Sequence, residues 1–251
     1  MWNMESAIVP VTGAASGIGL AVCEALRAAG ATPLLLDWNE QKLHAAAKQV
    51  FKDSEASLNY CYLVDVRDSR AVDKCFSNIA RTHGAVTHAV AAAGIVQPAD
   101  ILTLTDESWQ QVMDINLNGA MFFCRAAARQ LAELKRGSIV NIASIGGLAA
   151  RGNRISYVSS KAAMVNMTRA MAIDLGEFGV RVNAVAPGVI DTPIQDRNRG
   201  MFKSIVEGVA LKRIGTADEV ANVTLFLLSD LASYVTGTTV VVDGGMTASY
   251  R

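Results

Sequence analysis

Hydrophobic residues gather in short runs that alternate with longer amphipathic stretches along most of the chain. The runs that are rich in strand-forming residues lie at 7–12, 33–37, 58–64, 86–91, 138–143, 181–186 and 238–242. Most of them are apolar at successive positions instead of every second one, which is typical of strands buried on both faces. The pattern therefore predicts a parallel sheet whose two faces are both covered.

The stretches between these runs carry the period of amphipathic helices. Two sets of apolar residues show that spacing: Ile18, Val22 and Leu26, and Val72, Cys75, Phe76 and Ile79. Thr216 and Glu219 have the spacing of a capping box in front of another helix. A repeated order of strand, helix and strand implies right-handed crossovers. We predict an α/β, doubly wound (Rossmann) fold with a seven-stranded parallel sheet and helices on both faces.

Pro10 does not suit this pattern, because it lies inside the first run, which should form a central strand. Proline has no N–H to donate to a neighbouring strand. We expect a local irregularity in the ladder there.

Composition narrows the class of protein. Of the 251 residues 51% are hydrophobic and 18% are charged, and 23 Lys and Arg balance 23 Asp and Glu. This balance gives no sign of a nucleic-acid partner. No apolar run approaches the ~20 residues that a membrane-spanning helix needs, and the four cysteines form no CxxC pair. We expect a cytoplasmic protein without a membrane segment.

A glycine-rich segment joins the first run to the first helical pattern. It reads Thr12-Gly13-Ala14-Ala15-Ser16-Gly17-Ile18-Gly19. Glycines at a strand-to-helix turn let the backbone approach a pyrophosphate closely, and the helix N-terminus favours its negative charge. We therefore place the phosphates of a dinucleotide at this turn.

Asp37 is the residue predicted to choose the cofactor, because it ends the second run, 18 residues after Gly19. In such folds a carboxylate at this place hydrogen-bonds the adenosine ribose, and it repels a 2′-phosphate. Neither Ser16 nor Trp38 supplies a positive charge for that phosphate, so NAD is favoured over NADP. Trp38 either stacks on adenine or is an exposed aromatic at the strand end.

Candidate chemistry follows the fifth run. Ser144 comes directly after it, and Tyr157 and Lys161 stand four residues apart, which places them on one face of a helix. An ammonium near a phenol favours the ionised phenol, whose ordinary pKa is ~10. Tyr157 and Lys161 are therefore a candidate acid–base pair for catalysis.

In their order and spacing these segments resemble the short-chain dehydrogenase/reductase family, from about residue 6 to residue 246. Besides the glycine-rich loop, the parts that carry the resemblance are Asp65-Val66, Asn116, Ser144, Tyr157 with Lys161, Pro187-Gly188 with Thr192, and Asp243-Gly244-Gly245. The resemblance implies one NAD-binding domain over residues 1–251, which also carries the catalytic site.

The resemblance also implies roles for the matching catalytic residues. Tyr157 would be the general acid in ketone reduction and the general base in alcohol oxidation, while Ser144 hydrogen-bonds the substrate oxygen. Lys161 would lower the pKa of Tyr157 and bind the nicotinamide ribose. Asn116 would hold a water on a proton path. No metal is expected.

The implied NAD site is larger than this catalytic group. Asp65 would meet adenine, and the segment 187–192 would hold the nicotinamide carboxamide. The full set of implied cofactor-binding residues is Gly13, Ser16, Gly17, Ile18, Gly19, Asp37, Trp38, Asp65, Val66, Gly94, Tyr157, Lys161, Pro187, Gly188, Val189, Ile190 and Thr192.

One segment departs from the family pattern. Where the family usually has Asn-Asn-Ala-Gly after the fourth strand, this chain has Ala91-Ala92-Ala93-Gly94. The missing amides would ordinarily brace the sheet and the surroundings of the cofactor. The sequence therefore leaves the local order of this segment open.

Substrate choice and assembly are less fixed by the sequence. A substrate lid is expected at about 190–212, and its charged part, 195–203, looks mobile. Arg151 or Arg154 could meet a carboxylate or phosphate of the substrate, the alternative being two solvated arginines. The helix after Lys161 carries small and apolar residues on more than one face, which favours burial against a partner, and members of the family commonly form homotetramers.

Three functions are open at this point. The first is an NAD-dependent oxidoreductase that interconverts a small-molecule secondary alcohol, polyol or sugar and its ketone. The second is a 3-oxoacyl-thioester reductase or 3-hydroxyacyl dehydrogenase, because segment 210–215 resembles one common in such reductases, although these usually prefer NADP. The third is a non-catalytic NAD-binding regulator, which would have little reason to keep all four predicted catalytic residues.

Overall fold

The computed structural model describes residues 4–52, 56–194, 200 and 202–248 and contains one seven-stranded sheet. Its strands are β1 (Ile8–Thr12), β2 (Thr32–Asp37), β3 (Cys61–Leu63), β4 (His88–Ala91), β5 (Gly137–Ile142), β6 (Val180–Pro187) and β7 (Thr239–Val242). Every neighbouring pair is parallel, and the order is β3-β2-β1-β4-β5-β6-β7. The predicted doubly wound sheet is confirmed.

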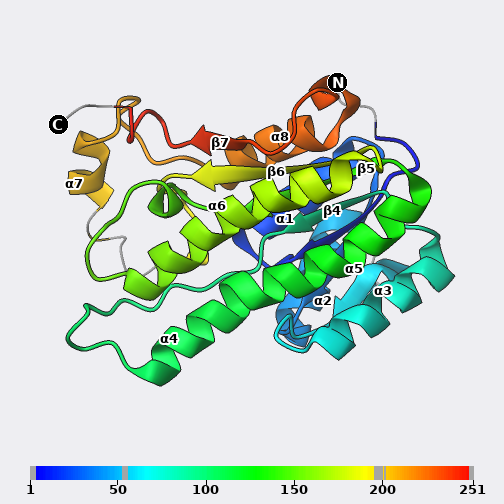
Figure 1. Cartoon of the computed structure of the whole chain (residues 1–251), viewed down its shortest axis with the longest axis horizontal. Coiled ribbons are helices and arrows are strands. Elements are labelled where there is room, and N and C mark those ends of the chain that lie inside the picture. Colours follow the sequence, from blue (N-terminus) through cyan, green and yellow to red (C-terminus); the bar gives the residue numbers. More distant parts are fainter. Residues whose placement is uncertain (1–3, 53–55, 195–199, 201, 249–251) are drawn as a thin grey trace.

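Helices cover both faces of this sheet (Figure 1). They are α1 (Gly17–Ala28), α2 (Glu40–Phe51), α3 (Ser69–His83), α4 (Asp106–Met113), α5 (Gly119–Leu134), α6 (Ile155–Gly176), α7 (Phe202–Glu207) and α8 (Ala217–Leu228). One core cluster packs α1, α2 and α8 against the sheet, and a second packs α3, α5 and α6 against the other face. A π-helical turn, Asp114–Asn118, joins α4 to α5.

The two cores explain why the strands read as continuous apolar runs. In β2, Leu35 belongs to the first cluster, while Leu34 and Leu36 belong to the second. Successive side chains point to opposite faces of a strand, and here both faces are buried. The predicted capping box is also present, since Thr216 Oγ1 accepts from Glu219 N and the Glu219 carboxylate accepts from Thr216 N.

Pro10 fits the sheet by leaving one ladder incomplete. It pairs in register with Leu34 of β2, whereas the β1–β4 pairing covers only Val11 and Thr12. The N–H and C=O of Ile8 both face β4, where they bond to Thr87, so the missing donor of Pro10 faces β4 as well. The expected irregularity is confirmed on that side alone.

The strand predicted at 58–64 is wrong at its start. Ala56–Tyr60 forms a 3₁₀ helix, and β3 begins only at Cys61. The turn places the ring of Tyr60 4.2 Å from that of Phe51 and 5.5 Å from that of His83. Aromatic packing at the sheet edge thus overrides the strand preference of these residues.

The strand order reverses between β1 and β4, and this is where a doubly wound sheet opens a crevice at its carboxyl edge. The arrowheads of β6 and β7 mark that edge on the left in Figure 1, where the loop between β4 and α4 and the first turn of α6 also lie. Among the described residues, no helix has both the length and the apolarity that a membrane span needs.

His88 lies in a buried polar cluster at the opposite edge of the sheet. Its Nδ1 is 2.9 Å from Thr87 Oγ1. Arg181 beside it donates to the backbone carbonyls of Leu227, Leu228 and Ser229 and so closes the C-terminus of α8. Burial, and to a lesser degree the charge of Arg181, lower the pKa of His88 to about 4.

We expect this histidine to make the fold sensitive to mild acid. The unfolded chain binds a proton at His88 near pH ~6.5, whereas the folded chain resists it down to a pKa of about 4. Stability should therefore fall as the pH drops through this window, by up to ~3 kcal/mol. Urea unfolding at pH 7, 6, 5 and 4.5 measures this fall, and the same slope in His88→Gln would contradict the assignment.

Candidate active site

A cleft of about 380 Å³ opens between the glycine-rich loop, the end of β2 and the segments that follow β3 and β4. The loop runs tightly beneath it, because a Cβ on Gly19 would lie 2.3 Å from Gly13 O. Gly13 itself has a φ of +67°, and a Cβ there would lie 2.9 Å from the backbone of Ala93. Only glycine suits these two positions, as a turn that receives a pyrophosphate requires.

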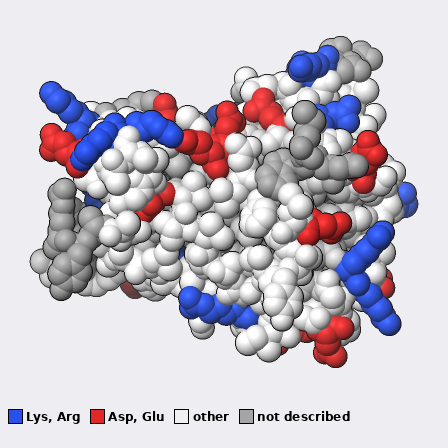
Figure 2. Space-filling model, turned by 90° about the horizontal axis from the view of Figure 1, so that it is seen from above, with Lys and Arg blue, Asp and Glu red and all other residues white. Residues whose placement is uncertain are grey.

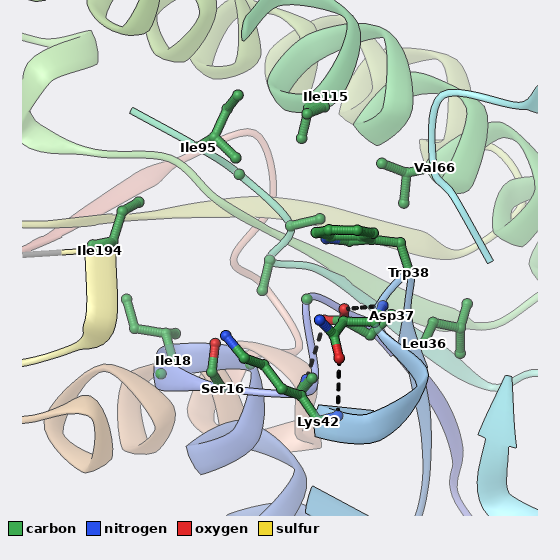
Figure 3. A pocket seen from close by; sticks show the side chains of 18 of the residues that line it. Ser16, Ile18, Leu36, Asp37, Trp38, Lys42, Val66, Ile95, Ile115 and Ile194 are labelled. Carbon is green, nitrogen blue, oxygen red and sulfur yellow. Dashed lines mark hydrogen bonds between the residues drawn. The ribbon is translucent and has the colours of Figure 1, made fainter. Parts of the chain in front are cut away.

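Asp37 is held in place at one wall of the cleft (Figure 3). Its Oδ2 accepts from Ala15 N at 3.3 Å and its Oδ1 from Asn39 N at 3.0 Å. A carboxylate has about four acceptor sites, so both oxygens can still accept hydroxyl groups. The side chain of Trp38 lines the same cleft and is 73% exposed, which agrees with both interpretations of this residue.

The sequence analysis overlooked Lys42, which also lines this cleft. It lies in the first turn of α2, and its side chain points toward Ser16 in Figure 3. The signal was its position five residues after Asp37, on the helix that follows β2. The cleft therefore holds a cation, Lys42, in addition to the Asp37 carboxylate.

Arg67 is a second residue that the sequence analysis overlooked. Its guanidinium binds both carboxylate oxygens of Asp65, with Nη2 2.6 Å from Oδ2. This hydrogen bond holds the pKa of Asp65 below its ordinary value. Asp65 and Val66 line the cleft as predicted, but an adenine amine would have to share the Asp65 carboxylate with Arg67.

The segment after β4 is braced in spite of its missing amides. Thr12 Oγ1 accepts from the N–H groups of Ala92 and Ala93, at 3.1 and 3.2 Å. Asn116 hydrogen-bonds both backbone polar groups of Ile95. Its Oδ1 accepts from Ile95 N, and its Nδ2 donates to Ile95 O. Thr12 and Asn116 thus supply hydrogen bonds to a segment whose order the sequence left open.

Gly94 brings the cleft next to the predicted catalytic residues. A Cβ on it would lie 3.4 Å from Asn116 Oδ1 and 3.5 Å from Lys161 Nζ. Lys161 is 4% exposed, and its Nζ donates to Ile142 O at 2.7 Å. Burial lowers its pKa to about 8, so the ammonium changes charge within reach of neutral pH.

Tyr157 lies beside this ammonium, with its ring centroid 5.9 Å from Lys161 Nζ. Burial raises the pKa of the Tyr157 phenol, and two neighbours oppose that rise, a hydrogen bond from Ser144 and the charge of Arg154. The Lys161 ammonium donates its hydrogen bond to a backbone carbonyl and not to the Tyr157 phenol. The predicted influence of Lys161 on Tyr157 stays a prediction.

Ser160 connects Tyr157 to Asn116 through two hydrogen bonds. Its Oγ donates to Tyr157 O at 2.7 Å and accepts from Asn116 Nδ2 at 3.2 Å. Asn116 belongs to the π-helical turn, and such turns often mark functional sites. The structure thus brings together all four residues predicted to be catalytic.

The segment after β6 completes the site on the far side of the glycine-rich loop. Thr192 packs on Gly17, where an added Cβ would lie 3.3 Å from Thr192 Cβ. A Cβ on Gly188 would meet Asp243, 2.7 Å from its Cβ, so the Pro187-Gly188 motif lies against the terminal Asp243-Gly244-Gly245 motif. Val189 and Ile190 are fixed by a bridge to Gly215.

Not every predicted cofactor residue lines the cleft itself. Those that do are Gly13, Ser16, Gly17, Ile18, Gly19, Asp37, Trp38, Asp65, Val66, Gly94 and Thr192. Those that lie beyond its lining are Tyr157, Lys161, Pro187, Gly188, Val189 and Ile190. Of the predicted lid, residues 195–199 and 201 lie outside the described residues, while α7 and 208–212 are described.

The described residues fit a dinucleotide. The glycine-rich loop leaves room that a Cβ would fill, and its turn opens α1, whose first N–H groups face anions. Asp37 presents an oriented carboxylate for hydroxyl groups. The buried acid–base group stands at the other end, against Gly94.

Comparison with known proteins agrees with this geometry. A family model described as enoyl-(acyl carrier protein) reductase matches residues 13–247. Galactitol 2-dehydrogenase (L-tagatose-forming) of Cereibacter sphaeroides is 35% identical, with 98% of this chain and 97% of the relative covered. The 2,3-dihydro-2,3-dihydroxybenzoate dehydrogenase of Bacillus subtilis is 32% identical over the same shares.

A further relative and a solved structure extend the likeness. The 3-oxoacyl-[acyl-carrier-protein] reductase of Thermotoga maritima is 32% identical, with 97% of this chain and 99% of the relative covered. The crystal structure of a short-chain type dehydrogenase/reductase from Mycobacterium marinum superposes with a TM-score of 0.92 at 29% identity, and 98% of each chain is covered. The chain belongs to the short-chain dehydrogenase/reductase family and is an oxidoreductase of the kind that uses a nicotinamide cofactor.

Proposed function

We propose that this chain is an NAD-dependent dehydrogenase that interconverts a secondary alcohol, polyol or sugar and the corresponding ketone. The observation that carries the proposal is the grouping of Tyr157 with Ser144, Lys161 and Asn116 next to Gly94, at the end of a cleft whose other end holds Asp37.

Tyr157 is the proton-handling group in this proposal. In alcohol oxidation its phenolate takes the hydroxyl proton, and NAD held in the cleft would supply the acceptor for the hydride of the carbinol carbon. Ser144 donates a hydrogen bond to the substrate oxygen and so orients it. Lys161, with a pKa of about 8, passes a proton onward through the hydrogen-bonded group around Asn116.

Polyols and vicinal diols are the favoured substrates among the neutral alcohols. The relatives named above act on galactitol and on a dihydroxylated ring acid, and this chain aligns with each over nearly its whole length. A reductase of 3-oxoacyl thioesters is the second candidate, because one relative of equal similarity is such an enzyme and segment 210–215 resembles that subgroup.

We also propose that the chain assembles as a homotetramer. Ile173 is 80% exposed on the outer side of α6, where Ala162 and Ala170 are exposed too. Val241 is 40% exposed on the edge strand β7. The face seen in Figure 2, above β7 in the view of Figure 1, has a broad uncharged area with charged side chains mostly toward its edges.

Burial of these apolar surfaces should hold four copies together. Sedimentation equilibrium at micromolar concentration is expected to give about four times the 26.6 kDa mass of one chain. Ile173→Glu should lower that mass, because it places a charge in a closed apolar contact. A monomeric wild type would contradict the proposal.

Tyr157→Phe should leave NAD binding nearly unchanged and remove most turnover. Phenylalanine keeps the ring but has no proton to exchange, and positioned acid–base catalysis is worth typically ~10²–10⁴-fold. The measurement is NADH absorbance with NAD and a panel of alcohols, polyols and 3-hydroxyacyl thioesters, together with NADH fluorescence titration. Turnover near the wild-type level would refute the role of Tyr157, and the preferred substrate class separates the two candidate functions.

Asp37 should determine the preference of the enzyme for NAD over NADP. Two charged hydrogen bonds to the ribose are worth roughly 1.5–3 kcal/mol each, so we expect at least a ~10-fold preference for NAD in kcat/KM. Asp37→Ala combined with Trp38→Arg should erode or invert it.

Lys42→Met is the matched variant on the same wall of the cleft. It should widen the preference for NAD by weakening the use of NADP, since Lys42 is the cation nearest to Asp37 in sequence on that wall. Equal use of both cofactors by the wild type, or a double variant that keeps the full preference, would show that Asp37 does not select the cofactor.

A further inference from the structure

Arg154 is a half-buried cation without a partner beside the proposed proton-handling group. It stands at the N-cap of α6, and its side chain makes no capping hydrogen bond. Within the part of the chain that the structure describes, no hydrogen bond or ion pair joins its guanidinium to another residue. The other arginines that lose solvent here, such as Arg181, have acceptors.

Such a guanidinium has an unfavourable environment in the free protein. Removing a charge from water costs free energy unless an opposite charge or acceptor replaces the water. Burial lowers the pKa of Arg154, and the like charge of Arg151 lowers it further. An anion placed against the Arg154 guanidinium would relieve both effects.

The backbone around Arg154 places it on the substrate side of Tyr157. A bridge pairs Arg154 with Ala99 of the loop between β4 and α4, and Ala99 N donates to Asn153 O at 3.1 Å. Figure 1 shows this loop and the first turn of α6 together at the carboxyl edge of the sheet. Arg154 and Tyr157 are three residues apart, which puts such side chains ~5–6 Å from one another at their Cβ atoms.

The loop that pairs with Arg154 and the loop after Ser144 both expose apolar side chains. Ile101 is 69% exposed and Leu102 92% exposed in the loop between β4 and α4, and Leu148 is 46% exposed in the loop after Ser144. A small hydrocarbon part of a substrate would find apolar contacts there. The combination suits a short molecule that has one apolar part and one anionic end.

We infer that Arg154 binds a carboxylate of the substrate, so that the alcohol presented to Tyr157 is that of a short hydroxy acid with its acid group one or two carbons from the carbinol. The inference rests on the proposed function and narrows its substrate class. The guanidinium fork matches the two oxygens of a planar carboxylate. The carboxylate itself is unchanged in the reaction, in which the carbinol loses its hydroxyl proton to Tyr157 and its hydride to NAD.

Turnover of matched substrates provides the first test. Wild type is assayed with NAD and 3-hydroxybutyrate, 2-hydroxybutyrate, butan-2-ol, 2,3-butanediol and glycerol 3-phosphate, the last to separate phosphate from carboxylate recognition. We expect kcat/KM to be highest for a hydroxy acid. In Arg154→Met the ratio of hydroxy-acid to neutral-alcohol kcat/KM should fall roughly 10- to 100-fold, the value of a charge-assisted hydrogen bond.

Two further variants control for charge and for shape. Arg151→Met removes the exposed neighbouring arginine and should keep the ratio within a few-fold of the wild type. Arg154→Lys keeps the positive charge but lacks the two-pronged guanidinium. Its ratio of hydroxy-acid to neutral-alcohol kcat/KM should lie between those of wild type and Arg154→Met. An equal loss for acids and neutral alcohols in Arg154→Met would overturn the inference, because it would show that Arg154 acts only through Tyr157.

Binding without turnover keeps the inference testable if the proposed function fails. Isobutyrate and its neutral counterpart isobutyramide are titrated into the protein with NADH bound, followed by nicotinamide fluorescence. We expect isobutyrate to bind more tightly than isobutyramide to wild type, and this difference to disappear in Arg154→Met. If no alcohol is oxidised, the proposed function fails alone; if wild type binds both probes equally, or the phosphate substrate is preferred, the carboxylate site is refuted.

Discussion

Backbone that leaves a sheet must find new hydrogen-bond partners, and in this protein the segment after β4 finds them in two buried side chains. Thr12 ends β1 and accepts from Ala92 and Ala93, while Asn116 in the π-helical turn holds both polar groups of Ile95. An unpaired buried N–H would cost free energy comparable to a lost hydrogen bond. These bonds therefore fix a backbone whose own side chains are too small to fix it.

The positions of the cofactor cleft and of the Tyr157–Lys161 pair depend on these hydrogen bonds from Thr12 and Asn116. The fixed segment brings Ala93 against Gly13 of the glycine-rich loop and brings Gly94 against Lys161. Gly13 and Gly94 allow these two close contacts because they have no side chains. The position of the glycine-rich loop therefore sets the position of the residues around Lys161. Asn116 takes part twice, because it also bonds to Ser160 beneath Tyr157.

Burial has opposite effects on the two titrating residues of the site. It raises the pKa of Tyr157 and lowers that of Lys161, because desolvation disfavours the charged form in both cases. Burial alone therefore favours the neutral phenol of Tyr157 and, above a pH of about 8, the neutral amine of Lys161. The groups that favour the phenolate come from outside the pair, Ser144 through its hydroxyl and Arg154 through its charge.

Much of this arrangement could be predicted from the sequence, because it follows from local patterns. Continuous apolar runs indicated the buried strands, and the spacing of Thr216 and Glu219 indicated a helix start that the structure confirms. The strand at 58–64 was predicted too long, since the packing of Tyr60 on Phe51 joins residues from two different elements. Local propensity does not record such contacts.

The residues that the sequence did not reveal act through long-range contacts. Thr12 lies 80 positions before Ala92, whose N–H it accepts, and its side chain looks like an ordinary strand residue. Lys42 and Arg67 follow strand ends by a few residues and become relevant only once the fold directs them to one cleft. Arg154 was named from the sequence as one of two arginines that could meet a substrate anion, but its environment depends on the loop that pairs with it through Ala99.

Charge is distributed unevenly along the proposed reaction path, and this has a consequence for how substrates are sorted. At the adenosine end Asp37 and Asp65 stand beside Lys42 and Arg67, so each anion has a cation within the same cleft. At the substrate end the Lys161 ammonium and the Arg154 guanidinium lie near Tyr157, and Arg151 acts on Arg154. A neutral alcohol leaves the Arg154 charge uncompensated, whereas the acid substrate proposed above would compensate it. The charge of Arg154 also opposes the rise in the pKa of Tyr157. The acid group of the proposed substrate would neutralise that charge while it orients the alcohol, so binding of the acid and ionisation of the phenol would compete for the same guanidinium.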